Sequence, residues 1–295
     1  MVGLAVNFQG KSDSTMVAPP IVLTTDFGAA SPYAGVLHGV VLRINPSATI
    51  VDLTHQIQSQ NIRQGSFILG TNYRFFPEGS IHVAVVDPGV GTNRKPLLVV
   101  TPTARFLAPD NGLLSFVLRD HLPEIPRQPG LVPLPPDCAA YYLTNSRYWL
   151  NPVSHTFHGR DIFAPVAAHL SLGVSPDQLG EPAREIVWLP TPQPTRQGNK
   201  LSGEVLYADH FGNLVTNIPA QELAELASIE VEIKGRRINH LSRTFHDQEL
   251  GQAGALLALV GSHGYLEIAV ADGSAAAYLG ASTGEPVRVS GLSTN

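Results

Sequence analysis

The chain has little cysteine, no long apolar run and no cluster of basic residues. Cys138 is the single cysteine among 295 residues, which excludes an internal disulfide and a cluster of thiolate ligands. No apolar run reaches the roughly 18 to 20 residues that span a bilayer. The formal net charge is −5, so the basic face that nucleic-acid binding needs is missing. These absences argue against nucleic-acid and membrane partners, and the cysteine usage fits a reducing cytoplasm.

Common signatures of nucleotide binding and hydrolysis are also missing. GxGxxG, the phosphate-loop lysine motif, GxSxG and HExxH do not occur, and GVGTNR (89–94) is too weak a substitute. His155 and His158 stand three residues apart, but no usual metal-ligand spacing surrounds them. We therefore expect no metal, and we interpret Cys138 as an ordinary thiol in a Pro-rich stretch.

The length and the 43% hydrophobic content suit two domains, each with its own core. Residues 1–18 lack the pattern of a secretory signal or an anchor, and we expect a flexible tail there. We expect an α/β domain over 19–190. A linker and an all-β, barrel-like domain should follow over 191–295, with the Pro-rich stretch 181–200 at the transition.

The first half alternates between strand-like and helix-like segments. Residues 33–44 form an expected helix with Val36, Val40 and Ile44 on one face. A second helical pattern covers 62–76, and a third covers 156–173. The apolar runs that predict strands are 21–28, 48–55, 80–89 and 96–102. Such alternation predicts a Rossmann-like, mostly parallel sheet with helices on its faces.

The second half changes character. Residues 121–155 look like a loop, and the region beyond 200 consists of short strands separated by turn signals. These strands are LSGEVLYAD, SIEVEIKG, GALLALVG, YLEIAVAD and PVRVS. Their spacing is typical of a small β-barrel or sandwich.

Three aspartates stand at or near the ends of expected strands. Ligands in parallel sheets bind outside the carboxyl ends of the strands, and Asp26, Asp52 and Asp87 fall there. Asp87 is followed by Pro-Gly-Val-Gly-Thr and then by Arg94, which can orient the carboxylate across the turn. With His158, these residues could position and polarise a water molecule, although a loop-stabilising ion pair and a structural histidine explain them equally simply.

Two polar motifs begin strands in the second half. DHFGNLVTNI (209–218) offers Phe211 for stacking on a base and Asn213 for reading a base edge. GSHGYLEIA (261–269) offers Ser262 and backbone N–H groups to a carboxylate. Both motifs are also compatible with simple Asn/Gly turns.

Seven motifs taken in order resemble one family. TTDFG, VDLTH, VDPGVGTNR, APDNGLL, TFHGRDIF, DHFGNLVTN and GSHGYLEIA are similar to those of the S-adenosylmethionine (SAM) hydroxide adenosyltransferases, which form adenosine. The match runs from about residue 20 to 290 and extends to the related fluorinases and chlorinases. It implies a homotrimer with SAM, the substrate, bound between the N domain of one subunit and the C domain of its neighbour. No cofactor is implied.

The resemblance also implies roles for individual residues. The water-activating set of the family corresponds to Asp87, Arg94 and His158. The expected substrate contacts are Asp26 with the ribose hydroxyls, Phe157 and Phe211 flanking the substrate, Asn213 with adenine, Asp209 with the methionine ammonium and Ser262 with its carboxylate.

Three features favour hydroxide over halide as the nucleophile. Fluorinases lack a carboxylate at the position of Asp87, carry serine at that of Gly159 and have an inserted loop before the APxNG motif. One departure concerns substrate binding, because Ser31 stands near a position where the family often has an acidic residue. The alternatives are a chlorinase-like SAM adenosyltransferase and a sensor that binds SAM or adenosine without turnover.

Overall fold

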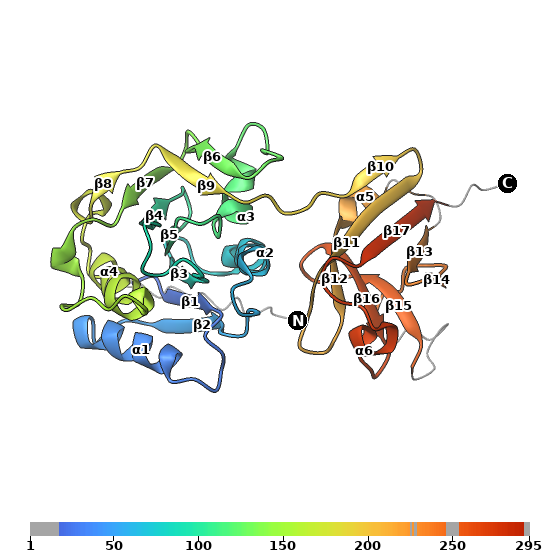
Figure 1. The fold of residues 1–295 in the computed structure, drawn as a ribbon, viewed down its shortest axis with the longest axis horizontal. Helices are drawn as coiled ribbons and strands as arrows, with labels where there is room; N and C mark the ends of the chain where they lie inside the picture. The colour runs from blue at the N-terminus through green and yellow to red at the C-terminus, as the bar shows by residue number, and fades with distance from the viewer. Residues whose placement is uncertain (1–17, 225, 227–228, 246–253, 292–295) are drawn as a thin grey trace, which may run out of the picture.

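The computed structural model describes residues 18–224, 226, 229–245 and 254–291. All but the last residue of the tail expected at 1–18 therefore lies outside the described residues. Figure 1 shows two parts, joined by an extended connection between β9 (Glu185–Trp188) and β10 (Thr195–Gln197). Within the described residues, no helix is both long and apolar enough to cross a membrane.

The first part is built on a seven-stranded sheet with the order β2-β1-β3-β5-β4-β7-β8. Its strands are β1 (Ile21–Thr25), β2 (Ile50–Thr54), β3 (Ile81–Val85), β4 (Pro96–Val100), β5 (Arg105–Pro109), β7 (Ala139–Tyr142) and β8 (Glu181–Pro182). The run β2-β1-β3-β5 is parallel, as expected for β1, β2 and β3, but its last strand, β5, was not predicted. The other pairings are antiparallel, so the sheet as a whole is mixed.

Helices cover both faces of this sheet, which explains why β3 is buried along its whole length. Along β3 and just past its end, Val83 and Val85 pack in one core with α1 (Tyr33–Ile44) and α4 (Ala164–Ser171). Ala84 and Val86 pack in a second core with α2 (Ile62–Asn72) and α3 (Ser115–Leu118). Figure 1 shows α1 and α4 together on one side of the strands and α2 on the other.

Helix α1 has the predicted bounds, but its predicted inner face is not its most buried one. Leu37 and Val41 are fully buried, whereas Val36 is 37% exposed. The third helical segment, predicted over 156–173, begins only after His158, with a π-helical turn (Gly159–Phe163) that runs into α4. The segment 121–155 is not a plain loop, because it contains β6 (Gly130–Pro133), which pairs with β9, and also β7.

The remaining short helical turns of the first part connect these elements. They are the 3₁₀ segments Tyr73–Phe75, Arg119–His121, Ser146–Tyr148 and Pro176–Gln178.

The second part is an antiparallel sheet with the order β14-β13-β17-β11-β12-β16-β15, with β10 also paired to β11. Its strands are β11 (Lys200–Ala208), β12 (Leu214–Pro219), β13 (Ile229–Ile233), β14 (Arg236–Ile238), β15 (Leu256–Val260), β16 (Tyr265–Val270) and β17 (Pro286–Gly291), with short helices α5 (Ala220–Ala224) and α6 (Ala275–Leu279). The edge strands β14 and β15 lie close together, so the sheet is a nearly closed barrel, as the sequence predicts.

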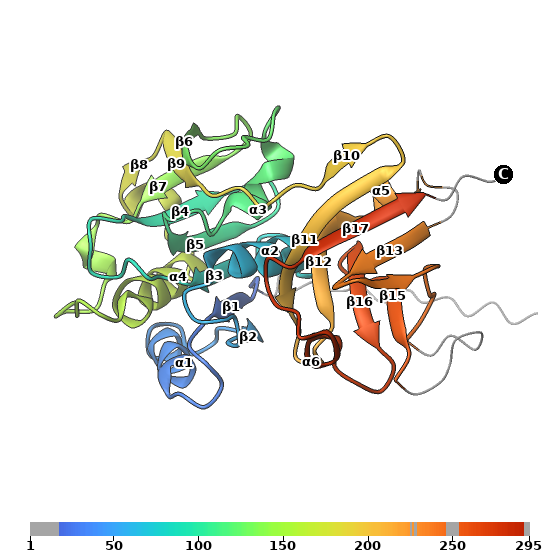
Figure 2. The same ribbon diagram turned by 45° about the vertical axis from the view of Figure 1, so that its right-hand side comes forward.

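The two parts pack through aromatic side chains, and Figure 2 shows α2 beside β11. Phe67 of α2 contacts the rings of Tyr207 and Tyr265, with ring centroids 6.0 and 4.9 Å apart. Arg119 donates a hydrogen bond of 2.9 Å to the Tyr265 hydroxyl.

Candidate active site

A cleft of about 530 Å³ opens where β1 and β3 end. Asp26 follows β1, Asp87 follows β3, and both line this cleft, as expected for ligand sites at the carboxyl ends of parallel strands. Phe157 and His158, just before the π-helical turn, form another part of its wall. The segments that form the cleft are thus far apart in sequence and are brought together by the parallel strand order.

Asp52 does not lie in this cleft, which corrects the expectation that all three aspartates share one site. Strand β2 continues to Thr54, and Asp52 pairs with Leu23 inside the ladder rather than following the strand end. Its carboxylate contacts His38 and His55 instead.

Asp87 and Arg94 form a buried ion pair beneath the cleft. Their side chains are 5% and 8% exposed. Arg94 Nε lies 2.9 and 2.8 Å from the two carboxylate oxygens, and Nη2 contacts Asp87 Oδ2 as well. Such a fork holds the carboxylate in one orientation. The remaining nitrogen, Nη1, is buried and has no hydrogen-bond partner among the described residues.

The turn between Asp87 and Arg94 depends on glycine. Gly91 has φ +77°, and a Cβ there would lie 2.3 Å from the backbone oxygen of His155. Only glycine allows so close an approach at positive φ. The turn is thereby packed against the segment that carries His158.

Arg94 also connects the carboxylate to the imidazole. Its Nη2 lies 3.0 Å from Nδ1 of His158. Because a guanidinium can only donate, Nδ1 accepts this bond, and the proton of the neutral ring is on Nε2. Burial and the nearby charge of Arg94 lower the pKa of His158 below 6.5. The ring is therefore neutral near pH 7.

An aromatic cluster forms one side of the cleft. Phe27, Tyr33 and Phe157 meet edge to face, with ring centroids 5.0 to 5.8 Å apart. A Cβ on Gly159 would lie 3.2 Å from the rings of Phe27 and Phe157. Any larger side chain at this position would push these rings.

Asp26 is anchored by the backbone, because its Oδ2 accepts a 2.8 Å hydrogen bond from Gln60 N. Ser31 donates to the carbonyl oxygens of Phe27 and Gly28, at 2.7 and 3.2 Å. It therefore braces the loop that carries Asp26.

Some residues that shape the site were not singled out from the sequence. Asn111 of the APDNG motif donates 2.9 Å to the backbone oxygen of Val86, next to Asp87. Asp161 of the HGRD motif is buried and accepts from the backbone and hydroxyl of Ser154, which fixes the loop before His158. Burial alone would raise the pKa of Asp161, but hydrogen bonds from Arg160 and Ser154 outweigh it and lower the pKa. The only sequence signal for both was their place in a motif.

The four expected substrate residues of the second part do not line this cleft. Asp209 Oδ1 accepts from the backbone N of Phe211 and Asn213, at 2.9 and 2.8 Å, and Asn213 Nδ2 donates 3.0 Å to Oδ2. The side chain of Phe211 is left 74% exposed, and Ser262 is exposed as well. Within one chain, the two groups of motif residues thus remain separate.

The fold and the site define a class of protein with a mixed α/β domain, a barrel-like domain and a buried carboxylate–guanidinium–imidazole cluster on a cleft. Two family models match this chain, the SAM hydroxide adenosyltransferase N-terminal domain over residues 21–180 and the C-terminal domain over 203–288. The chain belongs to this family.

Characterised relatives and solved structures cover nearly the whole chain. The (R)-S-adenosyl-L-methionine hydrolase of Salinispora arenicola is 37% identical, covering 92% of this chain and 97% of the relative, and that of Thermus thermophilus is 36% identical, covering 92% and 99%. A fluorinase from Actinoplanes is 29% identical over 85% of this chain and 90% of its own length. The crystal structure of an uncharacterized conserved protein from Thermotoga maritima has a TM-score of 0.80 and 33% identity, covering 92% and 99%.

Proposed function

We propose that this protein hydrolyses SAM to adenosine and L-methionine. The observation that carries the proposal is the buried Asp87 carboxylate on the cleft, clamped by Arg94, which also bonds His158. The hydrolase relatives, similar over almost their whole length, support the same substrate.

The reaction needs an oriented nucleophile rather than an acid. A water oxygen attacks C5′ of SAM, the C5′–S bond breaks, and its electron pair makes the sulfonium a neutral thioether. The sulfonium leaves without protonation, so a general acid adds little. Holding one water in line with the C5′–S bond supplies much of the rate enhancement.

The proton of the water goes to Asp87 in this proposal. Nδ1 of His158 already accepts from Arg94, and its protonated Nε2 can only donate. Asp87 lines the cleft and its oxygens keep lone pairs beyond those used by Arg94. His158 then helps orient the water or the substrate. Neither a cofactor nor a metal enters these steps.

We further propose that Asp26 binds the ribose hydroxyls and that the second part of a neighbouring subunit completes the site in a cytoplasmic homotrimer. Phe211 would stack on the substrate, Asn213 would read adenine, and Asp209 and Ser262 would hold the methionine end. The exposure of Phe211 and its separation from the cleft support a site that is complete only between two chains.

Product analysis tests the reaction. Incubation with each sulfonium epimer of SAM should give adenosine and methionine, with the (R) epimer preferred, and Asp87→Asn should lower the rate by about 10² to 10⁴-fold, the range for general-base catalysis. Asp177→Asn, on a turn that does not line the cleft, is the matched control. Formation of 5′-chloro-5′-deoxyadenosine in chloride would identify the halide-using alternative, and intact SAM would identify the sensor.

Mixing two inactive variants tests the shared site. Asp87→Asn and Asn213→Ala damage different parts of the chain, so mixed trimers contain some sites with both residues intact. Activity should return in part after subunit exchange. Exchange demonstrated by mass spectrometry without recovered activity would show that each site belongs to one chain.

A further inference from the structure

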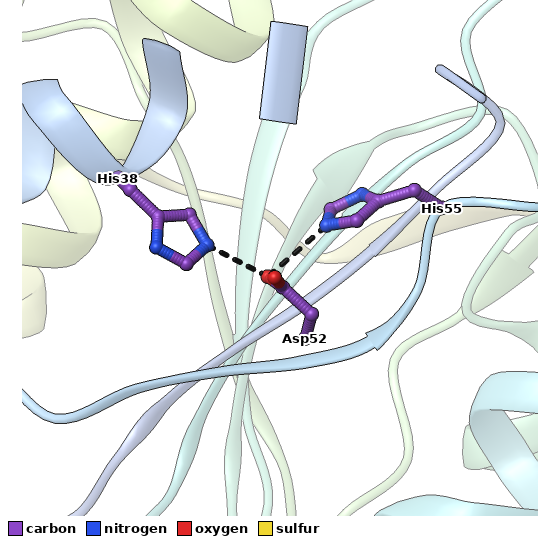
Figure 3. Close-up of side chains that lie close together, drawn as sticks. All are labelled: His38, Asp52 and His55. Atoms are coloured by element: carbon purple, nitrogen blue, oxygen red, sulfur yellow. Dashed lines mark hydrogen bonds and ion pairs between the residues drawn. The ribbon is translucent and has the colours of Figure 1, made fainter. Parts of the chain in front are cut away.

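Outside the cleft, three side chains with metal-binding atoms converge on one point. His38 comes from α1, Asp52 from β2, and His55 follows that strand directly, as Figure 3 shows. The Nε2 atoms of His38 and His55 lie 2.8 and 3.0 Å from the same oxygen, Oδ1 of Asp52. All three ligand atoms lie within 4.8 Å of one another.

The contacts of His55 are not those of a satisfied structural histidine. Its side chain is 10% exposed. Its Nε2 is buried, and its one polar neighbour is Asp52 Oδ1 at 3.0 Å, a contact that does not meet the geometry of a regular hydrogen bond. A buried ring nitrogen without a partner is costly, and native proteins usually supply one. Figure 3 shows that Nε2 lies on the edge of the ring that faces Asp52, opposite His38.

The other nitrogen of His55 is arranged as metal-bound imidazoles usually are. Nδ1 lies 2.8 Å from Oγ1 of Thr25. Thr25 Oγ1 also accepts from the backbone N of Phe27, at 3.2 Å, and it can accept from Nδ1–H as well. That tautomer leaves a free lone pair on Nε2. Ligating histidines commonly donate their second N–H in this way, which fixes the ring for the metal.

We propose that His38, Asp52 and His55 bind a divalent transition-metal ion of the zinc type. Two imidazoles and one carboxylate are a common zinc ligand set, with bonds of about 2.0 to 2.2 Å. Atoms 2.8 to 3.0 Å apart need to separate only slightly to surround such an ion. Asp52 is 42% exposed, so solvent can take the fourth position.

The chain contains a second group of similar composition, which suits zinc less well. His121, Asp137 and Cys138 lie together. Burial and the nearby Asp137 raise the pKa of the Cys138 thiol to about 12, so the thiolate that a metal needs is disfavoured.

The proposed ion would act on the cleft through the backbone. Thr25 is adjacent to Asp26, and the backbone oxygen of His55 accepts a 2.7 Å hydrogen bond from Gly28 N. Fixing His55 therefore fixes the loop that carries Asp26 and Phe27. The ion is a positioning element, since its ligands do not line the cleft.

Calorimetry with zinc chloride on untagged, chelator-treated full-length protein tests the site. We expect about one equivalent of zinc per chain, micromolar or tighter, and little binding of magnesium. Cobalt should give the intense visible absorption of a four-coordinate site. His38→Ala, on α1, should weaken zinc binding by at least about 10-fold. The matched control, His169→Ala on α4, should leave zinc binding unchanged.

A second set of variants locates the ion. His55→Ala should abolish binding, and Cys138→Ser should leave it unchanged. The proposal is overturned if the chain binds no zinc, if His38→Ala binds as tightly as wild type, or if Cys138→Ser abolishes binding. Binding is measured without SAM, so this result is independent of the proposed reaction. If the reaction occurs, zinc removal should raise KM for SAM more than it lowers kcat.

Discussion

The buried histidine on β3 should make stability depend on pH between 4 and 6.5. His82 is fully buried and stacks on Phe106, with ring centroids 5.1 Å apart. Neither ring nitrogen has a hydrogen-bond partner among the described residues. Burial lowers the pKa of His82 from 6.5 to about 4. The folded protein therefore resists protonation that the unfolded chain accepts.

The sign and size follow from proton linkage. Between pH 6.5 and 4 the unfolded chain binds more protons at this position, so the free energy of unfolding falls as the pH falls. Well above pH 6.5 the His82 ring is neutral in both states, so the free energy of unfolding has its full value there. About 2 kcal/mol is lost by pH 5, and about 3 kcal/mol once the folded ring also protonates, at about 1.4 kcal/mol per pH unit.

Urea denaturation at pH 7.5, 6.5, 5.5 and 5 measures this loss. Both tryptophans, Trp149 and Trp188, lie in the same part of the chain as His82, so their fluorescence reports on that part. His82→Phe keeps an aromatic ring at this position and removes the titration. Between pH 7.5 and 5 the free energy of unfolding should fall for both proteins, but by about 2 kcal/mol less for His82→Phe than for wild type. His210→Gln, which removes an exposed imidazole, is the control. Parallel pH curves for wild type and His82→Phe would refute the reasoning.

Three further predictions concern the cleft. Asp26→Asn should weaken SAM binding by about 1.5 to 3 kcal/mol, the range for hydrogen bonds to charged groups. Calorimetry with an analogue that lacks the ribose hydroxyls should show no difference in affinity between wild type and the variant. An equal loss of affinity for both ligands would contradict the ribose contact. Because the pKa of His158 is lowered, kcat/KM should be level above pH 7 and fall only below pH 6.5, where protonation of Nδ1 removes the acceptor for Arg94. An inflection due to this ring above pH 6.5 would contradict the lowered pKa. Gly91→Ala should lower kcat by at least about 10-fold, since its Cβ would collide with the His155 carbonyl, and a crystal structure with an unmoved turn and full activity would disprove this.

Single helices and strands could be predicted because each depends on the spacing of apolar residues within a short stretch of sequence. The bounds of α1, the buried strands β1 and β3 and five strands of the barrel follow from the apolar pattern, and those five are β11, β13, β15, β16 and β17. Strand β5 was missed because RFLAP is short and carries a charge and a proline. The pairing of Asp52 with His38 was hidden for a different reason, since it depends on how α1 packs on the sheet.

Four of the residues that line the cleft, Asp26, Asp87, Phe157 and His158, were named from the sequence, but their geometry was not. Asp87, Arg94 and His158 stand in separate motifs, and spacing alone cannot show that Arg94 bridges 64 residues to His158. The tautomer of His158 also required the position of the guanidinium. Asn111 and Asp161 act through backbone contacts that no side-chain pattern reveals.

The pairing of Asp87 with Arg94 also constrains how such a site can evolve. Replacing the carboxylate by a neutral side chain would leave a guanidinium buried and unpaired, which is strongly unfavourable. A small anion entering the vacated space would restore the balance of charge. A single substitution at Asp87 would therefore leave the buried Arg94 guanidinium as a binding group for a small anion.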